Sequence, residues 1–376
     1  MNNYLHRIAP WVSGLSPYQP GKPIEELERE LALNKIVKLA SNESPYGPSP
    51  NVTKALTAAI NGLSRYPDGN GYLLKQALAR QLNIASDQIT LGNGSSDVLE
   101  MVARVFLTPA HDAVFSDYAF AMYPIIVQSV GAKAKTARAK NPDSSMPYGH
   151  DLVAIREQIG DNTRLVFIAN PNNPTGTYLN SDSLFQFIAE LPEHVMCVVD
   201  EAYFEYANYA DVVDYPNCLQ WLEKFPNLIV TRTFSKAFGL AGLRVGCAIS
   251  SPQVTELLNR IRQPFNVSIP AMVAAEAALS DTVHMQKTLE ANRMGLVQLI
   301  RGLEQRGFKV NPSVANFVCV DMRCDSESLF QKLLKEGVII RPLASYAMPD
   351  YIRVTTGTEE ENQVFFKALD RLYEHD

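Results

Sequence analysis

The chain contains little of what disulfide-rich, metal-binding or membrane-spanning proteins need. Its 376 residues include five cysteines and six histidines, and the histidines stand apart from one another in no metal-ligand pattern. No apolar run reaches the ~18 residues that a membrane-spanning helix requires. The first ten residues lack the apolar core of a signal peptide. We therefore expect a cytoplasmic protein with no metal site and no membrane segment.

Paired cysteines and an excess of positive charge are also missing. The cysteines show no C-x-x-C spacing and mostly lie inside apolar runs, which predicts reduced thiols in a core. They are Cys197, Cys218, Cys247, Cys319 and Cys324. A net charge of −6 and a pI near 5.6 argue against a nucleic-acid partner. We interpret the one basic stretch, residues 133–140, as the solvated face of an edge strand, where lysines hinder edge-to-edge pairing.

What the chain does contain is an alternation of strand-like and helix-like segments. Short runs rich in Val, Ile and Ala predict strands at 88–91, 113–116, 133–139, 164–169, 195–199, 228–231 and 245–250. Amphipathic segments between them predict helices at 51–60, 73–82, 97–106, 152–159 and 181–190. This alternation is typical of an α/β fold with a mainly parallel sheet covered by helices on both faces.

The pattern changes after Pro264. A long Ala-rich helical region at 271–303 leads to short predicted strands at 308–310, 316–321, 338–342 and 351–355, then to a closing helix. The chain is also longer than one ordinary core supports. We predict an N-terminal arm (1–45) that packs with the small domain, a large domain (46–264) and a smaller α+β domain (265–376).

Polar segments follow several of the predicted strands directly. Residues 92–96 follow the strand at 88–91, Asn170 follows 164–169, Asp200 follows 195–199 and Lys236 comes shortly after 228–231. In open parallel sheets, ligands bind beyond the carboxyl ends of the strands. We therefore predict that one pocket gathers these segments.

Lys236 is the most informative of these residues. It lies in the segment TFSKAFGLAGLR, residues 233–244, just past an apolar run. A lysine whose pKa is lowered by burial and a neighbouring cation is a good nucleophile, while Thr233, Ser235 and Arg244 could hold a phosphate. With NPNNPTG (170–176) and VDEAY (199–203), this segment resembles the fold-type I pyridoxal-phosphate-dependent aminotransferases, in which the lysine binds the cofactor covalently.

The resemblance implies roles for residues around the cofactor ring. Asp200 is expected to keep the ring nitrogen protonated so that the ring can accept electrons. Tyr203 and the Asn170 amide are expected to hydrogen-bond the phenolic oxygen. Taken alone, an aspartate after a buried strand also fits a simple cap of the next segment, and Tyr203 fits a core aromatic. Phe120 is expected to stack on the ring, with Tyr118 as second choice and core packing as the alternative.

The cofactor phosphate is expected at the segment GNGSSD, residues 92–97. It matches the dinucleotide motif G-x-G-x-x-G only weakly, because Asp97 takes the place of the third glycine. Glycines before a helix nevertheless allow a tight turn, and free N–H groups at a helix N-terminus bind anions. Ser95 and Ser96 would add donors to the same phosphate.

Two arginines and two tyrosines carry the resemblance to histidinol-phosphate aminotransferases in particular. Arg353, in YIRVTTG, resembles the arginine that grips a substrate anion in this fold, and Arg341 lies in VIIRP. Two arginines with tyrosine hydroxyls suit a phosphate dianion better than a carboxylate. Tyr18 and Tyr66 match tyrosines that contact the substrate phosphate. The second comes from the neighbouring subunit there, which implies a homodimer with shared active sites.

The resemblance covers nearly the whole chain, from the segment around Tyr18 to residues 353–357. It implies the conversion of histidinol phosphate and 2-oxoglutarate into imidazole-acetol phosphate and glutamate. The nearest rival is an aromatic amino acid aminotransferase on the same scaffold, with Arg353 holding an α-carboxylate. A decarboxylase of a phosphorylated amino acid and a regulatory protein of the same fold are further alternatives. The last of these usually needs a DNA-binding region, for which the chain has no spare basic segment.

Overall fold

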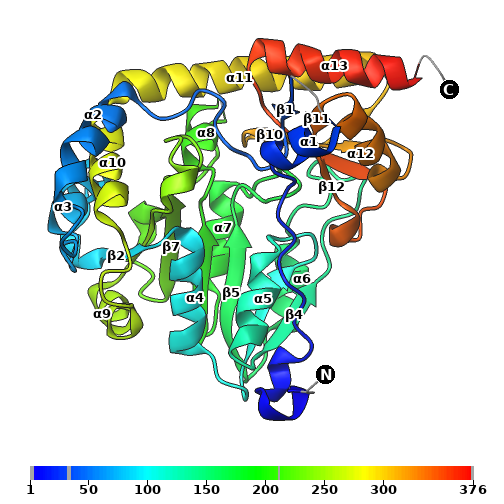
Figure 1. Cartoon of the computed structure of the whole chain (residues 1–376). Helices are drawn as coiled ribbons and strands as arrows, with labels where there is room; N and C mark the ends of the chain where they lie inside the picture. The colour runs from blue at the N-terminus through cyan, green and yellow to red at the C-terminus, as the bar shows by residue number, and fades with distance from the viewer. Residues whose placement is uncertain (1–3, 32–34, 211, 374–376) are drawn as a thin grey trace.

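The computed structural model describes residues 4–31, 35–210 and 212–373, and a seven-stranded sheet lies at its centre (Figure 1). The strands follow the order β2-β8-β7-β6-β5-β3-β4, and within this sheet only β8 runs antiparallel to its neighbours. The strands are β2 (Ile89–Gly92), β3 (Asp112–Ser116), β4 (Lys133–Ala137), β5 (Thr163–Ala169), β6 (Met196–Asp200), β7 (Leu228–Thr233) and β8 (Gly246–Ser250). The predicted α/β fold with a mainly parallel sheet is confirmed.

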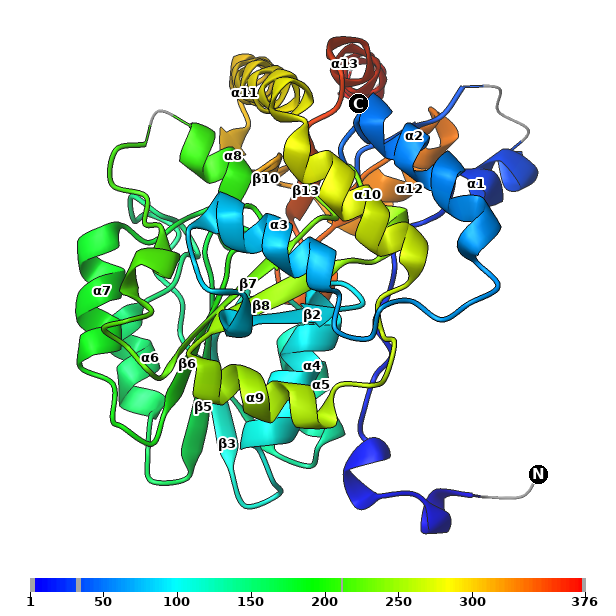
Figure 2. The same ribbon diagram turned by 90° about the vertical axis from the view of Figure 1, so that its left-hand side faces the viewer.

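Both faces of the sheet are buried, because alternate side chains of each strand enter different cores. On β5, Leu165 and Phe167 join one core, whereas Val166 and Ile168 join the other. The first face is covered by α4 (Ser95–Phe106), α5 (Met122–Ser129) and α9 (Pro252–Ile261). The second is covered by α3 (Tyr72–Leu82), α6 (Leu152–Gln158), α7 (Ser181–Ala189) and α10 (Ile269–Ser280), with α2 (Pro50–Ala59) packed against α10. Figure 2 shows helices on both sides of the strands.

The predicted helices of this part are present, and each begins and ends within two residues of the expected positions. Ser49 caps α2 by accepting a hydrogen bond from the Asn51 N–H at 3.0 Å, with Pro50 at the first helical position. The sequence did not predict α5, α8 (Phe204–Tyr209) or α9. In α5, a proline and adjacent β-branched residues (Pro124, Ile125, Ile126) obscure the helical pattern, and burial against the sheet stabilises the helix regardless.

The basic stretch at 133–140 includes β4, which lies at the edge of the sheet. Lys133 and Arg138 are exposed. Lys135 Nζ lies 2.8 Å from Asp112 Oδ2 on the neighbouring β3. The interpretation of this stretch as a solvated edge strand is therefore confirmed.

The long helical region predicted at 271–303 consists of two helices. Asp281 separates α10 from α11 (Thr282–Gln305) and caps α11 by accepting a hydrogen bond from the His284 N–H at 3.0 Å. α10 packs in a core of the large sheet, whereas α11 contributes Leu299 and Leu303 to a separate core around the small sheet. The packing therefore changes near Asp281 and not at Pro264, and the three-part division of the chain stays a prediction.

The C-terminal part is built on a four-stranded sheet in the order β12-β13-β10-β9, which is covered by α11, α12 (Ser326–Lys335) and α13 (Glu359–Tyr373). Its strands are β9 (Lys309–Val310), β10 (Phe317–Asp321), β12 (Arg341–Pro342) and β13 (Tyr351–Thr355). The strand expected at 338–342 is divided, because β11 (Val338–Ile339) pairs with a different strand. α11 and α13 lie along the top of Figure 1.

The N-terminal segment contacts both parts of the molecule. β1 (Val37–Lys38) pairs with β11 in parallel, and Leu27 of α1 (Ile24–Leu31) packs against Leu334 and Ile339 of the C-terminal part. Nearer the N-terminus, the Trp11 indole donates a hydrogen bond to the Ser129 backbone oxygen at the end of α5 (3.1 Å). The segment between these contacts passes the mouth of the cavity described below.

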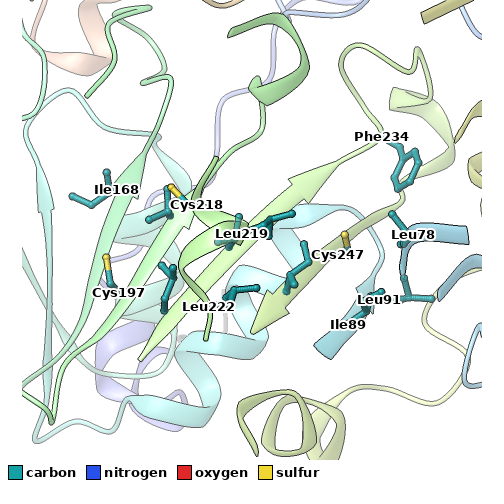
Figure 3. Packing of buried hydrophobic residues seen from close by; sticks show 14 of the residues in the cluster. Leu78, Ile89, Leu91, Ile168, Cys197, Cys218, Leu219, Leu222, Phe234 and Cys247 are labelled. Atoms are coloured by element: carbon teal, nitrogen blue, oxygen red, sulfur yellow. The ribbon is translucent and has the colours of Figure 1, made fainter. Parts of the chain in front are cut away.

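The cysteines are free thiols, as predicted. Cys197, Cys218 and Cys247 lie among apolar side chains on one face of the large sheet (Figure 3). Cys319 is buried in the C-terminal part and Cys324 is half-buried. In the described ranges, no helix combines the length and apolar character needed to cross a membrane.

Candidate active site

A cavity of about 310 Å³ lies at the carboxyl edge of the large sheet and borders the small sheet. Because β8 is antiparallel, Arg244, which comes just before it, reaches the same edge as residues that follow the parallel strands. The pocket predicted at the strand ends is therefore present. All the predicted site residues except Asn170 and Tyr66 line it: Tyr18, Ser95, Ser96, Phe120, Asp200, Tyr203, Thr233, Ser235, Lys236, Arg244, Arg341 and Arg353.

Lys236 lies just beyond the end of β7, and its Nζ donates a hydrogen bond to the Ser41 backbone oxygen at 3.1 Å. The pKa of Lys236 falls to about 8, chiefly because burial disfavours the charged form. The charges of Arg353 and Arg244 also lower this pKa, while two nearby carboxylates oppose them. A sizeable fraction of the amine is therefore neutral, and nucleophilic, near neutral pH.

The lowered pKa makes a testable difference in reactivity. In the protein without a bound cofactor, we expect pulse labelling of Lys236 by an amine-specific reagent to rise with pH and reach its midpoint near 8. An ordinary exposed lysine titrates near ~10.4, so surface lysines in the same digest serve as the control. Peptide mass spectrometry after pulses between pH 6 and 11 measures both. A midpoint for Lys236 that coincides with the surface lysines would contradict the burial argument.

The N-terminus of α4 and Arg244 form an anion-binding corner of the cavity. Gly94 (φ 84°) turns the chain into α4, whose first N–H groups have no partner within the helix. A side chain at Gly94 would collide with the Arg244 guanidinium, so glycine lets this cation approach the turn closely. Arg244 Nη1 donates a hydrogen bond to Ser235 Oγ at 3.0 Å. The remaining donors come from the residues expected at a phosphate: Ser95, Ser96 and Thr233.

Asp200 ends β6 and is 4% exposed. Its Oδ2 accepts a hydrogen bond from the Tyr123 hydroxyl (3.0 Å) and its Oδ1 accepts one from Thr231 (2.8 Å). Burial raises the pKa of Asp200 above its usual value, although these two hydrogen bonds and the charge of Lys236 partly oppose the shift. A cation held against this carboxylate would keep it ionised. The sequence analysis did not identify Tyr123 as a site residue.

Tyr203 lines the cavity beside Lys236, whose Nζ lies 5.8 Å from the centre of its ring. The Tyr203 hydroxyl accepts a hydrogen bond from Asn42 Nδ2 at 2.9 Å. Asn42 is itself held by Thr355 at the end of β13, whose hydroxyl donates to Asn42 Oδ1 at 3.0 Å. Sequence reasoning missed Asn42, although it lies within the part of the chain that the family resemblance covers.

The structure corrects the expectation for Asn170. Its side chain is fully buried and bonded to the backbone of Leu179, donating to the oxygen at 3.1 Å and accepting from the N–H at 2.9 Å. The Asn170 amide therefore hydrogen-bonds the backbone of its own loop, and it does not line the cavity. Asn173, three residues further along the same motif, does line it and accepts a hydrogen bond from Arg353 Nη1.

Of the two aromatics considered for stacking, only Phe120 lines the cavity. It packs edge-on against Tyr123, with ring centres 5.8 Å apart. Tyr118 lies elsewhere, in edge contact with Tyr148 (5.1 Å), which in turn hydrogen-bonds Tyr351 of the C-terminal part. Tyr118 therefore belongs to the contact between the large sheet and the C-terminal part of the molecule.

Arg341 and Arg353 face each other across the pairing of β12 with β13. Like charges directly opposite in a sheet are destabilising unless something compensates them. Arg353 is 7% exposed and donates a hydrogen bond to the Ala40 backbone oxygen at 2.6 Å, while its Nε has no hydrogen-bond partner. Arg341 donates a hydrogen bond to the Gln19 backbone oxygen at 2.9 Å. Neither pairs with a carboxylate in the part of the chain that is described. This arrangement favours an anionic ligand.

The two predicted tyrosines are placed differently. Tyr18 lies at the mouth of the cavity, one residue before Gln19, and is 45% exposed. Tyr66 is 81% exposed and stacks on Phe265, with ring centres 4.6 Å apart, away from the cavity of its own chain. The structure therefore brings Tyr18 to the site and leaves Tyr66 on the surface.

Together these residues can form a covalent bond through a lysine, bind two separate anions and stabilise a cation at a buried carboxylate. The family model for aminotransferases of class I and II matches residues 34–369, a span that contains every residue lining the cavity except Tyr18 and Gly21. The chain belongs to this family. Within this family, the chain is similar to individual histidinol-phosphate aminotransferases.

Curated relatives match almost the whole chain. Histidinol-phosphate aminotransferase 2 of Methylococcus capsulatus is 54% identical over 363 residues, which cover 96% of this chain and 97% of the relative. Histidinol-phosphate aminotransferase 1 of Nitrosococcus oceani is 50% identical over 371 residues, which cover 99% and 98%. The crystal structure of the Sinorhizobium meliloti histidinol-phosphate aminotransferase in complex with pyridoxal-5′-phosphate aligns with a TM-score of 0.89 at 29% identity, covering 98% of both chains.

Proposed function

We propose that the protein is a pyridoxal-phosphate-dependent aminotransferase that converts histidinol phosphate and 2-oxoglutarate into imidazole-acetol phosphate and glutamate. The observation that carries the proposal is the facing pair Arg341 and Arg353, which has no carboxylate partner among the described residues and borders the cavity that holds Lys236. Near-complete matches to histidinol-phosphate aminotransferases at 50% identity and above support the choice of substrate.

The residues fit pyridoxal phosphate. The corner of Gly94 and Arg244 offers amide, hydroxyl and guanidinium donors to a phosphate, and no carboxylate of the described chain pairs with Arg244 there. Lys236 and Asp200 line the same cavity and would hold opposite ends of the ring system. Phe120 offers an aromatic face, and Asn173 with Tyr203 offers polar groups to the ring oxygen. When bound, the cofactor supplies an electron-accepting ring.

The protein residues then do the proton transfer and the positioning. Lys236 Nζ, with its lowered pKa, would take the proton from the substrate Cα as a general base and, as a general acid, would deliver it to the cofactor carbon that is bonded to the substrate nitrogen. Asp200, held in place by Tyr123 and Thr231, would stay ionised beside a protonated ring nitrogen of the bound cofactor. Arg341 and Arg353 bind the substrate phosphate, which fixes Cα near Lys236.

The substrate assignment is tested by comparing kcat/KM for histidinol phosphate and phenylalanine, each with 2-oxoglutarate. We expect a large preference for the phosphate ester in the wild type. In Arg341→Ala, kcat/KM for histidinol phosphate should fall by about 10- to 100-fold, because one charge-assisted hydrogen bond contributes about 1.5–3 kcal/mol. Phenylalanine turnover should change little.

Comparable kcat/KM values for the two substrates, or an equal loss for both in Arg341→Ala, would instead assign the arginines to a carboxylate. The enzyme would then be an aromatic amino acid aminotransferase. Arg301→Ala, at an exposed arginine of α11, is the matched control and should leave both substrates unaffected.

We also propose that the active form is a homodimer. Tyr66 and Phe265 are exposed aromatic rings stacked on one another, and Tyr66 does not reach the cavity of its own chain. A second copy that covers these rings would place its Tyr66 at the substrate phosphate. Equilibrium sedimentation tests the dimer, and a monomer with full activity would exclude a shared site. We propose the cytoplasm as its location, as expected for a biosynthetic enzyme of this kind.

A further inference from the structure

A second cavity, of about 350 Å³, lies on the other side of Thr233 from the active-site cavity, since Thr233 borders both. It is enclosed by α3, α8, the segment that follows β7, and the ends of α10 and α11 that meet at Asp281. Nothing in the proposed reaction uses it. Its walls are mainly apolar: Leu78, Leu82, Phe204, Phe234, Leu279 and Leu289. Leu78 and Phe234 are drawn in Figure 3.

Two charged side chains, Arg232 and Glu205, line this cavity, and a third, Glu201, binds Arg232. Arg232 lines it and is bound to the fully buried Glu201, donating from Nε to Oε2 at 2.7 Å, with Nη2 2.6 Å from the same oxygen. The Arg232 guanidinium also covers the Phe204 ring, 3.3 Å from its centre. Glu205, on α8, lines the cavity as well, but its nearest cation is Arg232 Nη1 at 3.9 Å. Arg232 is therefore engaged mainly by Glu201.

Glu205 is left with an unused acceptor. Its Oε2 is buried and has no hydrogen-bond donor. Burial raises the pKa of Glu205 to about 7, and the charge of Arg232 only partly opposes this. A buried carboxylate oxygen without a donor is costly, and a donor with a positive charge relieves that cost most effectively. Glu201, Glu205 and Arg232 together carry a net charge of −1 when both carboxylates are ionised, which also favours a cation.

We propose that this second cavity binds a small amphipathic cation, that is, an apolar or aromatic ring that carries one protonated nitrogen. The ring packs against the leucine and phenylalanine side chains, and the nitrogen donates a hydrogen bond to Glu205 Oε2. The volume is within the range of small-molecule sites, about 300–1,000 Å³. An anion of the same shape is disfavoured, because Glu201 already holds Arg232 and Glu205 repels negative charge.

The test measures binding of N,N-dimethylbenzylamine to the cofactor-loaded enzyme by isothermal titration calorimetry. This tertiary amine is a cation at neutral pH and cannot form a covalent bond with a carbonyl cofactor. For about ten non-hydrogen atoms we expect a Kd on the order of 0.1–1 mM. Phenylacetate, of similar shape but opposite charge, should bind at least tenfold more weakly. Absence of amine binding, or equal binding of phenylacetate, would overturn the proposal.

Variants locate the bound cation. Glu205→Gln removes the negative charge at nearly constant shape and should weaken amine binding at least tenfold. Gln81→Trp places a large side chain at the exposed rim of the cavity and should block binding, whereas the matched control Gln81→Ala should retain it. Aminotransferase turnover should be unchanged in both Gln81 variants, which shows that they fold. Amine binding that survives both Glu205→Gln and Gln81→Trp would place the probe elsewhere and overturn the assignment.

Discussion

Replacing Lys236 by alanine is expected to lower kcat with histidinol phosphate and 2-oxoglutarate by at least about 10⁴-fold, the upper range for loss of a general acid–base group. Pyridoxal phosphate should still bind, without a covalent bond, because the anion-binding corner at Gly94 and Arg244 and the buried Asp200 are untouched. Steady-state kinetics measures the first effect. Absorbance before and after passage through a desalting column measures whether the cofactor is retained and how it is attached.

Two comparisons make the Lys236 result specific. Lys133→Ala removes an exposed lysine of β4, far along the sheet edge, and should leave kcat unchanged. An added small amine is expected to restore part of the proton transfer in Lys236→Ala, since a free base can occupy the space that the side chain leaves. Multiple turnovers by Lys236→Ala without any added amine would show that another group moves the Cα proton.

The fold could be predicted where local and tertiary preferences agree. Apart from the solvated edge strand β4, the strands of the large sheet are buried on both faces, so their sequences are mainly apolar and easily recognised. The errors fall where tertiary packing overrides local pattern. α5 contains Pro124 and β-branched residues yet is helical, and the helix-like sequence of α10 continues into α11 although Asp281 divides them. Only the packing of each helix against a different core reveals that break.

The sequence predicted which motifs form the site, but not which asparagine side chain of a motif faces the ligand. The motif NPNNPTG contains three asparagines that could hold a ligand, and the sequence offers no way to tell which of them the loop uses for its own backbone. In the structure Asn170 is bonded to Leu179, and Asn173 faces the cavity. Asn42 was missed for a related reason, because its contact with Tyr203 joins residues 161 positions apart.

Replacing Arg353 by glutamine is expected to have two separable effects. Arg353 is buried, and its guanidinium is the strongest charge that lowers the pKa of Lys236. With two charge-assisted hydrogen bonds to the substrate phosphate lost, kcat/KM for histidinol phosphate should fall by about 10²- to 10⁴-fold. With the nearby positive charge lost, the pKa of Lys236 in the cofactor-free protein should rise above about 8, seen as a higher midpoint in amine labelling.

Arg353→Lys separates these two contributions. A lysine keeps the positive charge near Lys236 but cannot reproduce the planar fork that donates to Asn173 and to the Ala40 oxygen. We therefore expect the labelling midpoint of Lys236 to stay near 8 while kcat/KM still falls by at least about tenfold. If the glutamine variant kept wild-type kcat/KM, Arg353 would not bind the substrate. If both variants shifted the midpoint equally, the change in Lys236 would come from altered packing and not from charge.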